Sequence, residues 1–359
     1  MPAQAPFTLS NTRIIAVGLS NAGGAVLRAA ERDAAWRDGV VAVAPNVLPG
    51  VGGRALYDYA SDAALWMTCA QAAKPLVDAP LPMPPAVIAG QREAACAALV
   101  AAGMVSNRQF AADQAYQHLR QQGWSDAALS AGTLSTAFDL WRGLGVTYAS
   151  AYGRYPQHRM PCGFTFAAVD ATVAPRPATR AERALWWSDG PGIAPSVGVQ
   201  IVVGAGEQSA FSRLQCIRNL FTGVGTDAQR LRAGVEATRA GLPRAGLPIL
   251  VIHGVDDGLV PEAFSGGAYV EWVRGAGSYP LSHWRVHKAQ HFDAFLALPA
   301  FGSRYVPLLP YAYAGLDAMW QTLESGSVIG DASIHPAPRG LTNEQISPLS
   351  RADLRLPFE

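Results

Sequence analysis

The chain has 359 residues, enough for two domains of ordinary size or for one large domain with an insertion. Half of its residues are hydrophobic, only 15% are charged, and 28 basic residues balance 27 acidic ones. This composition excludes a charge-rich disordered chain and a coiled coil, and it gives no reason to expect binding to nucleic acid or to a membrane surface. No apolar run approaches the length of about 18 residues that a transmembrane helix needs, and the first six residues lack the basic and apolar regions of a signal peptide.

Four short apolar segments are predicted to be strands. They lie at residues 13–18, 39–44, 248–253 and, more weakly, 284–287. Their Val, Ile and Leu runs lack polar alternation, which is typical of parallel strands buried on both faces. An Ala-rich helix is expected at 22–36, so that the first two strands and this helix predict a βαβ unit and an α/β protein.

The segment between the second and third strands, residues 55–240, is too long for a connecting loop. It is rich in Ala and aromatic residues, and helical patterns occur at 91–104, 110–122 and 181–187. We therefore expect an inserted, mainly helical cap or lid.

This insertion defines the rest of the expected organisation. The sheet-forming core would comprise residues 1–54 and 241–330. The tail, 331–359, has few large apolar residues and is expected to run extended over the surface.

The four cysteines are Cys69, Cys96, Cys162 and Cys216, and none are spaced as C-x-x-C. Buried free thiols are therefore predicted ahead of one or two disulfides.

The first catalytic motif follows the first predicted strand, at residues 18–22. A nucleophile elbow, G-x-S-x-G, holds a serine on a sharp strand-to-helix turn, and the residues two before and two after it must be small. Here these are Gly18 and Ala22, so Ser20 is the predicted nucleophile. The competing interpretation is an ordinary turn with a capping serine. A phosphate-binding loop is excluded, because Gly24 and Ala25 stand where Lys and Ser or Thr are needed.

A serine nucleophile needs a base, and the base needs an acid that orients it. The third strand ends in a turn that carries Asp257, at the same sheet edge as the elbow. Asp257 fits the acid position of an H-G-x-x-D-x-x-V-P pattern, and Asp256 is the alternative. His253, at the end of the strand, is interpreted as a structural histidine.

The predicted base is His291, which follows the fourth strand. His283, His287 and His291 share a four-residue spacing, which would suit a metal site if the segment were helical. A strand is expected there instead, and the glutamate of an H-E-x-x-H motif is lacking, so a metal site is the minor alternative. Asp293 is interpreted as a residue at a helix N-terminus.

The sequence resembles the D-(−)-3-hydroxybutyrate oligomer hydrolases, which are esterases that cleave short oligomers released from a storage polyester. The similarity begins with the elbow and spans nearly the whole chain, and the Gln-His-Phe-Asp-Ala-Phe motif is far more specific than the elbow. The similar segments are 16–30, 148–154, 161–164, 253–261, 289–295 and 338–340.

The resemblance implies the C-terminal half of an α/β-hydrolase sheet with a large inserted cap. It implies hydrolysis of 3-hydroxybutyrate dimers and oligomers, with Ser20 as nucleophile and no metal or organic cofactor. The assignment of Asp257 as the acid and of His291 as the base depends on motif and chain order together. The alternatives are another esterase or peptidase of this fold, such as a feruloyl-esterase-like or prolyl-oligopeptidase-like protein, or an inactive hydrolase that needs a missing half.

The chain departs from the family in two respects. Ala22 stands where the family usually has Gly, and the family proteins are longer, with the additional part before the elbow. The Asn21 N–H can supply one oxyanion bond, but the second donor has no visible source, which predicts a turnover lower by about 10² to 10³. An exposed first strand would favour self-association. Because the family includes secreted members, an extracellular or periplasmic location is expected if the protein begins upstream.

Substrate selection is assigned to the insertion. Aromatic residues there could line an apolar cleft, although such residues are more often part of a core. The candidates are Tyr148, Tyr152, Phe164, Phe166, Trp186 and Trp187.

Overall fold

A computed structural model describes most of the chain, namely residues 12–32, 38–77, 79, 83–156, 159–170, 172, 174–186, 200–203, 209–337, 339–342 and 345–357. Trp187 and Pro338, which the sequence analysis named, lie outside these residues. The chain divides into two compact units. Unit 1 contains Met1–Tyr59, Trp66–Phe138 and Thr238–Glu359, and unit 2 contains Ala60–Leu65 and Asp139–Ala237.

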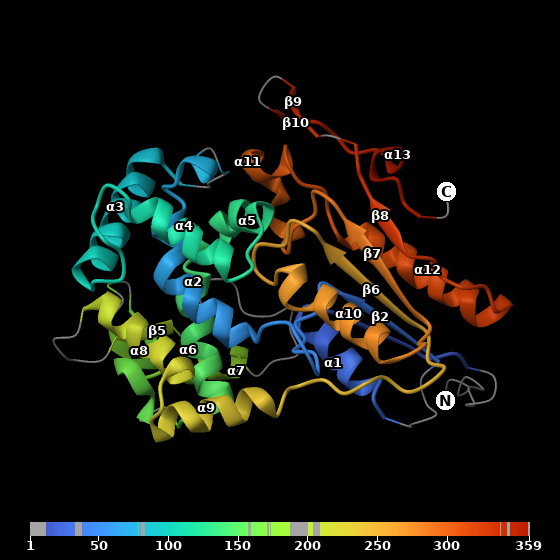
Figure 1. Ribbon diagram of the computed structural model, residues 1–359, viewed down its shortest axis with the longest axis horizontal. Helices are drawn as coiled ribbons and strands as arrows, with labels where there is room; N and C mark the ends of the chain where they lie inside the picture. The colour runs from blue at the N-terminus through green and yellow to red at the C-terminus, as the bar shows by residue number, and fades with distance from the viewer. Residues whose placement is uncertain are drawn as a thin grey trace. The chain divides into compact units, whose positions relative to one another are not determined.

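Unit 1 is built on a parallel β-sheet, which has five strands in the described part of the chain (Figure 1). The strand order is β1-β2-β6-β7-β8, and each neighbouring pair is parallel. The predicted α/β class, with a mainly parallel sheet, is confirmed. The strands are β1 (Ile15–Leu19), β2 (Gly39–Val43), β6 (Ile249–Gly254), β7 (Leu281–Val286) and β8 (Ala332–Ile334).

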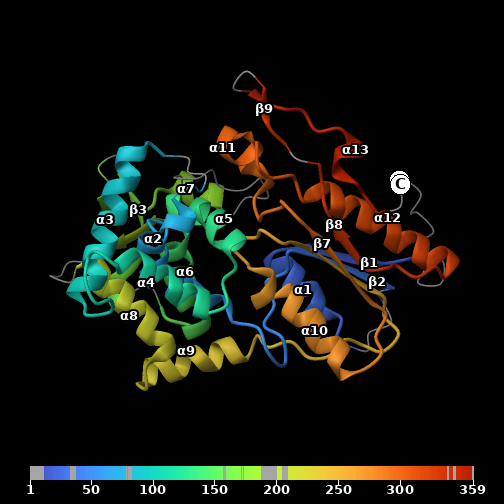
Figure 2. The same cartoon turned by 45° about the horizontal axis from the view of Figure 1, so that its top comes forward.

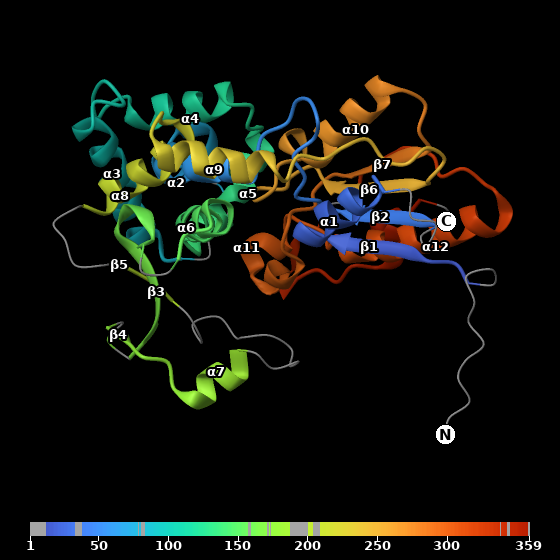
Figure 3. The same cartoon turned by 90° about the horizontal axis from the view of Figure 1, so that it is seen from below.

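Both faces of this sheet are covered, because the apolar strands present side chains alternately to the two sides. Val41 and Val43 of β2 pack on the face that α12 (Leu309–Ser325) covers. Val40 and Ala42 pack on the opposite face, against α1 (Asn21–Ala29) and α10 (Gly266–Ala276). The two layers are seen from different sides in Figures 2 and 3.

The C-terminal segment differs from the expected surface tail. Ala332–Ile334 forms β8, which pairs with β7 and buries Ile334 in the core on the α12 side. The same core contains Leu354, whose carbonyl accepts a hydrogen bond from the Tyr311 hydroxyl at 2.7 Å. Pairing with β7 and contact with Tyr311 hold these short segments in place, and their sequences show little hydrophobic periodicity that could predict them.

The remaining elements of unit 1 are mostly helical, and the helices expected near 91–104 and 110–122 correspond to α3 and α4. They are α2 (Leu56–Ala70, whose residues 60–65 belong to unit 2), η1 (Lys74–Leu76), α3 (Pro85–Ala101), α4 (Ala111–Gln121), α5 (Asp126–Ala137), η4 (Glu262–Phe264), η5 (Asp293–Ala297), α11 (Pro299–Gly302), β9 (Leu341–Thr342), β10 (Gln345–Ile346) and α13 (Arg351–Leu354).

Unit 2 combines helices with a small antiparallel sheet of strand order β4-β3-β5 (Figure 3). The helix expected at 181–187 is present as α7. The elements are α6 (Leu140–Gly153), η3 (Pro161–Gly163), β3 (Phe164–Val169), β4 (Pro175–Arg176), α7 (Arg180–Trp186), β5 (Gln200–Val203), α8 (Ala210–Thr222) and α9 (Thr226–Glu236).

The prediction of free thiols is wrong, because all four cysteines are paired. Cys69 bonds to Cys96 between α2 and α3, and Cys162 bonds to Cys216 between η3 and α8. The partners are 27 and 54 residues apart in sequence, but their Cα atoms lie only 4.8 and 5.5 Å apart. Tertiary proximity creates these pairs, and the spacing of cysteines along the chain does not reveal it.

In the described part of the chain, no helix combines the length and apolar character that crossing a membrane requires.

Candidate active site

Ser20 occupies a sharp turn between β1 and α1. Its backbone has φ 56° and ψ −119°, a conformation that non-glycine residues adopt only when their surroundings hold them there. Its N–H donates to the Val43 carbonyl at 2.9 Å, and its own carbonyl accepts from the N–H groups of Gly24 and Asn46 at 3.0 and 2.9 Å. These bonds fix the serine at the carboxyl end of β1.

The close backbone approach in this turn explains its small residues. A Cβ added to Gly18 would lie 2.1 Å from the Ala22 carbonyl oxygen, so only glycine fits at that position. Ala22 itself is exposed, and its methyl group is therefore tolerated. The second position of this turn that has no room for a side chain is Gly24, where a Cβ would lie 1.9 Å from the Asn46 carbonyl oxygen.

Asp257 lies in the turn after β6 and is fully buried. Its Oδ1 accepts hydrogen bonds from the N–H groups of Leu259 and Val260 at 2.9 and 2.7 Å. Burial by itself would raise the pKa of Asp257, but electrostatic attraction to the His291 ring and hydrogen bonds with the imidazoles of His253 and His291 hold that pKa well below its usual range. The Asp257 side chain is therefore a carboxylate, and one of its oxygens is occupied by hydrogen bonds within the turn.

His291 links this carboxylate to the serine. Its Nδ1 lies 2.7 Å from Asp257 Oδ2, and its Nε2 lies 3.0 Å from Ser20 Oγ. Because a carboxylate can only accept, Nδ1 carries the proton and Nε2 is the acceptor for the serine hydroxyl. The structure thus brings together the three residues proposed from sequence, although Ser20 and His291 lie 271 positions apart.

The loop that carries His291 is held by the side chain of Gln290, a buried residue that the sequence analysis did not single out. The Gln290 amide donates to the Phe292 carbonyl at 2.6 Å and accepts from the Phe292 N–H at 2.9 Å. One side chain therefore ties the residue before His291 to both main-chain polar groups of the residue after it. The only sequence signal is a glutamine directly before the histidine.

Asp293 anchors the other end of this loop. Its two carboxylate oxygens accept from the N–H groups of Leu308 and Leu309, at 2.7 and 2.8 Å, where α12 begins. Burial raises the pKa of Asp293 above its usual value, and these bonds oppose that effect. The carboxylate satisfies helix N–H groups that have no partner within the helix.

The two other candidates near this turn, Asp256 and His253, make different contacts. The Asp256 N–H donates to the Ala289 carbonyl at 3.2 Å, and burial raises the pKa of the Asp256 carboxyl. His253 is completely buried; its Nε2 donates to the Val260 carbonyl at 2.9 Å and lies 3.6 Å from Asp257 Oδ2. His253 therefore supports the turn that presents the Asp257 carboxylate.

The histidines of the metal alternative point to different surroundings. His283 lies on strand β7, 3.4 Å from Glu262, and burial lowers its pKa to about 4 although Glu262 opposes the shift. His287 stacks on His335 with ring centroids 3.8 Å apart. Among the described residues, no group of three or more His, Cys, Asp or Glu side chains is placed to hold a metal ion.

The remaining site candidates fall in both units. Asn21 is the first residue of α1, and its side-chain oxygen accepts a hydrogen bond from Asn46 at 2.8 Å. Tyr148 and Tyr152 lie on α6 of unit 2 with ring centroids 5.3 Å apart, and Trp186 ends α7. Their role in substrate binding stays a prediction.

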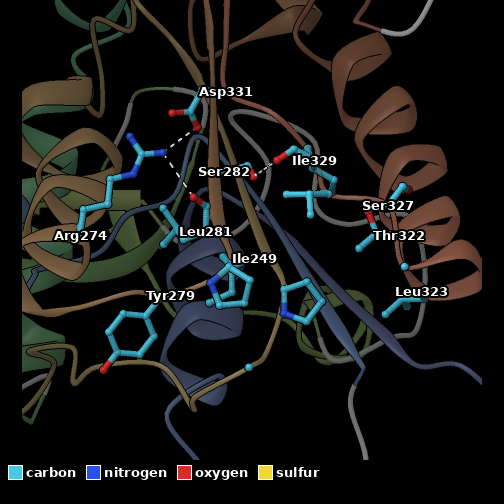
Figure 4. Close-up of a pocket in the computed structure, with 15 residues that line it drawn as sticks. Ile249, Arg274, Tyr279, Leu281, Ser282, Thr322, Leu323, Ser327, Ile329 and Asp331 are labelled. Atoms are coloured by element: carbon cyan, nitrogen blue, oxygen red, sulfur yellow. Dashed lines mark hydrogen bonds and ion pairs between the residues drawn. The ribbon is translucent and has the colours of Figure 1, made fainter.

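A cavity of about 640 Å³ lies at the opposite edge of the parallel sheet (Figure 4). The starts of β6 and β7 and the C-terminal end of α12 line it, and Arg274 pairs with Asp331 at 2.6 Å on its wall. The Ser282 hydroxyl donates to the Ile329 carbonyl at 2.6 Å. Ligands of open parallel sheets bind at the carboxyl ends of the strands, which is the edge that carries Ser20.

Fold and site together define an α/β protein with serine, histidine and aspartate in one hydrogen-bonded chain, an arrangement found in acyl-transfer hydrolases. The model of the 3HB-oligomer hydrolase family matches residues 2–357, and the chain belongs to this family.

Curated relatives carry the name D-(-)-3-hydroxybutyrate oligomer hydrolase. That of Paracidovorax citrulli is 34% identical over 94% of this chain and 54% of its own length. Those of Polaromonas naphthalenivorans and Ralstonia pickettii are 32% and 29% identical, over 97% and 98% of this chain and 54% and 53% of their own lengths. The chain thus spans about half the length of the curated relatives it matches. No solved structure matches it.

Proposed function

We propose that this chain carries the catalytic centre of a serine esterase of the α/β-hydrolase fold that cleaves 3-hydroxybutyrate dimers and oligomers. The observation that carries this proposal is the hydrogen-bonded chain from Ser20 Oγ through His291 to Asp257, with lengths of 3.0 and 2.7 Å. The chain order of serine, aspartate and histidine is that of α/β hydrolases. Membership of the oligomer hydrolase family supports the substrate class.

The chemistry begins when Ser20 Oγ attacks the carbonyl carbon of an ester and passes its proton to His291 Nε2. The carbon–oxygen bond to the leaving alcohol then breaks, and His291 returns the proton to that alcohol, the hydroxyl end of one oligomer fragment. Water attacks the acyl-serine with His291 again as base, which releases the acid fragment and restores Ser20. Asp257 keeps the imidazole in the tautomer that can accept the serine proton.

The tetrahedral intermediate carries a negative oxygen that needs hydrogen-bond donors. We assign one donor to the Asn21 main-chain N–H, because this residue follows the nucleophile and opens α1, where the helix dipole favours negative charge. Among the described residues, we assign no second hydrogen-bond donor for this oxygen. The expectation of a turnover lowered by about 10² to 10³ therefore stays a prediction.

We also retain residues 55–240 as a proposed substrate cap. This segment includes helices of both units, and its boundaries stay predictions. A cap in this position would let the insertion choose the substrate while the sheet supplies the chemistry.

The test compares the 3-hydroxybutyrate dimer with an aryl acetate and a peptide, using the chain and its Ser20→Ala variant. We expect the dimer to be cleaved, and we expect Ser20→Ala to lose both this hydrolysis and labelling by a fluorophosphonate probe while keeping its circular dichroism spectrum. Full labelling of the variant would contradict the role of Ser20. Preferred cleavage of the peptide would contradict the substrate class.

A further inference from the structure

Three aromatic rings lead away from the proposed base. The Phe292 ring packs edge-on against His291 with centroids 5.1 Å apart. The Phe295 ring lies 5.4 Å from Phe292, and the Phe138 ring lies 4.7 Å from Phe295. We call Phe292, Phe295 and Phe138 the aromatic row.

One side of this row is anchored in the protein, and its far end is open. Phe292 and Phe295 are partly buried against a cluster that contains Leu134, Phe301 and Tyr305. Phe138, just after α5, exposes 46% of its surface. The row therefore continues from the imidazole to an apolar surface that the core does not bury.

We propose that the aromatic row is a binding subsite for the hydroxyalkanoate chain on one side of the scissile ester. The inference rests on the proposed function, which places the scissile carbonyl at Ser20 Oγ, 3.0 Å from the imidazole that Phe292 contacts. A substrate chain that leaves this point along the loop meets Phe292 first, then Phe295, then Phe138.

The chemistry of the row suits this substrate class. Each 3-hydroxybutyrate repeat carries a methyl group and a methylene group and no charge, and phenyl rings offer apolar contact without hydrogen-bond donors or acceptors. Three bonds of a peptide backbone span up to about 3.6 Å, so the four bonds of one hydroxyacid repeat span roughly 5 Å. The steps between ring centroids, 4.7 to 5.4 Å, match this repeat.

The experiment measures binding without turnover. Ser20→Ala removes the nucleophile, and titration calorimetry then gives the dissociation constants of the 3-hydroxybutyrate dimer and tetramer. We expect the tetramer to bind more tightly than the dimer, and we expect an added Phe138→Ser to weaken the tetramer about fourfold or more with little effect on the dimer. Fourfold is the factor that corresponds to about 0.8 kcal/mol, the transfer free energy of one methylene group.

The matched control is Phe110→Ser, because Phe110 exposes 48% of its surface and lies outside the row. An equal effect of the two substitutions on tetramer binding overturns the proposal, as does a tetramer that binds no better than the dimer. Phe138→Leu should keep most of the affinity, which separates lost apolar contact from misfolding. A wild-type chain that cleaves no ester while Phe138 still governs tetramer binding refutes the proposed function and leaves the subsite standing.

Discussion

Replacing Asp257 by asparagine tests the proposed catalytic chain at its most constrained atom. Asp257 Oδ1 accepts from two backbone N–H groups, of Leu259 and Val260, so this position must remain an oxygen in Asp257→Asn. The amide NH₂ must then take the Oδ2 position, which lies 2.7 Å from His291 Nδ1. Two donors cannot face each other there, and Nδ1 is forced to become the acceptor.

The consequence is a tautomer that cannot work as the base. With Nδ1 unprotonated, a neutral imidazole carries its proton on Nε2, the atom 3.0 Å from Ser20 Oγ. The serine then has no acceptor for its proton. A wrong tautomer in an otherwise intact triad lowers kcat by about 10⁴, which corresponds to about 5 kcal/mol in the activation free energy.

The assay follows hydrolysis of the 3-hydroxybutyrate dimer and of an aryl acetate, and nitrogen NMR of the His291 ring reports the tautomer. Asp256→Asn is the matched control, because Asp256 is the preceding residue and its carboxylate bonds to the Lys288 backbone, whereas the Asp257 carboxylate bonds to His291. We expect this control to keep its activity within a few-fold. Activity of Asp257→Asn within tenfold of wild type, or a larger loss in Asp256→Asn, would refute the reasoning.

Four further outcomes are expected. Gln290→Ala should lower kcat about tenfold to a hundredfold in a steady-state assay with little change in KM, because the loop that positions the base is released; an unchanged kcat would show that these bonds are dispensable. His283 has a pKa of about 4 in the folded protein and about 6.5 in the unfolded chain. As the pH falls from about 6.5 to about 4, the unfolded chain binds a proton at this histidine that the folded protein does not bind, so the free energy of unfolding decreases. Urea titrations should show a loss of about 3 kcal/mol over this window, flattened in His283→Asn; parallel pH profiles would refute this cause. Replacing the Cys162 and Cys216 pair by serine should lower the free energy of unfolding by about 3 to 5 kcal/mol, since the bond closes a long loop; a thermal melt unchanged by the substitution would contradict this. We propose that the chain associates through β1, which is an edge strand among the described residues and exposes 44% of Val17, and Val17→Lys should reduce the light-scattering mass; aggregates of the same size in both proteins would count against that edge.

The sequence alone was sufficient for the features that depend on near neighbours. Continuous apolar runs at 39–44 and 248–253 predicted parallel strands, because a strand buried on both faces leaves no polar position. The small residues around Ser20 predicted a sharp turn, since the backbone closes on Gly18 within four residues.

Other features depend on residues distant in sequence, and only the tertiary structure decided them. Strand β8 is three residues long and exists because β7 offers it a partner. The disulfides form because helix packing brings distant cysteines within reach. Motif spacing favoured Asp257 as the acid but left Asp256 as an alternative, because a pattern does not show in which direction each of two adjacent turn residues points. The structure places the Asp257 carboxylate on His291 because two backbone N–H groups hold its other oxygen.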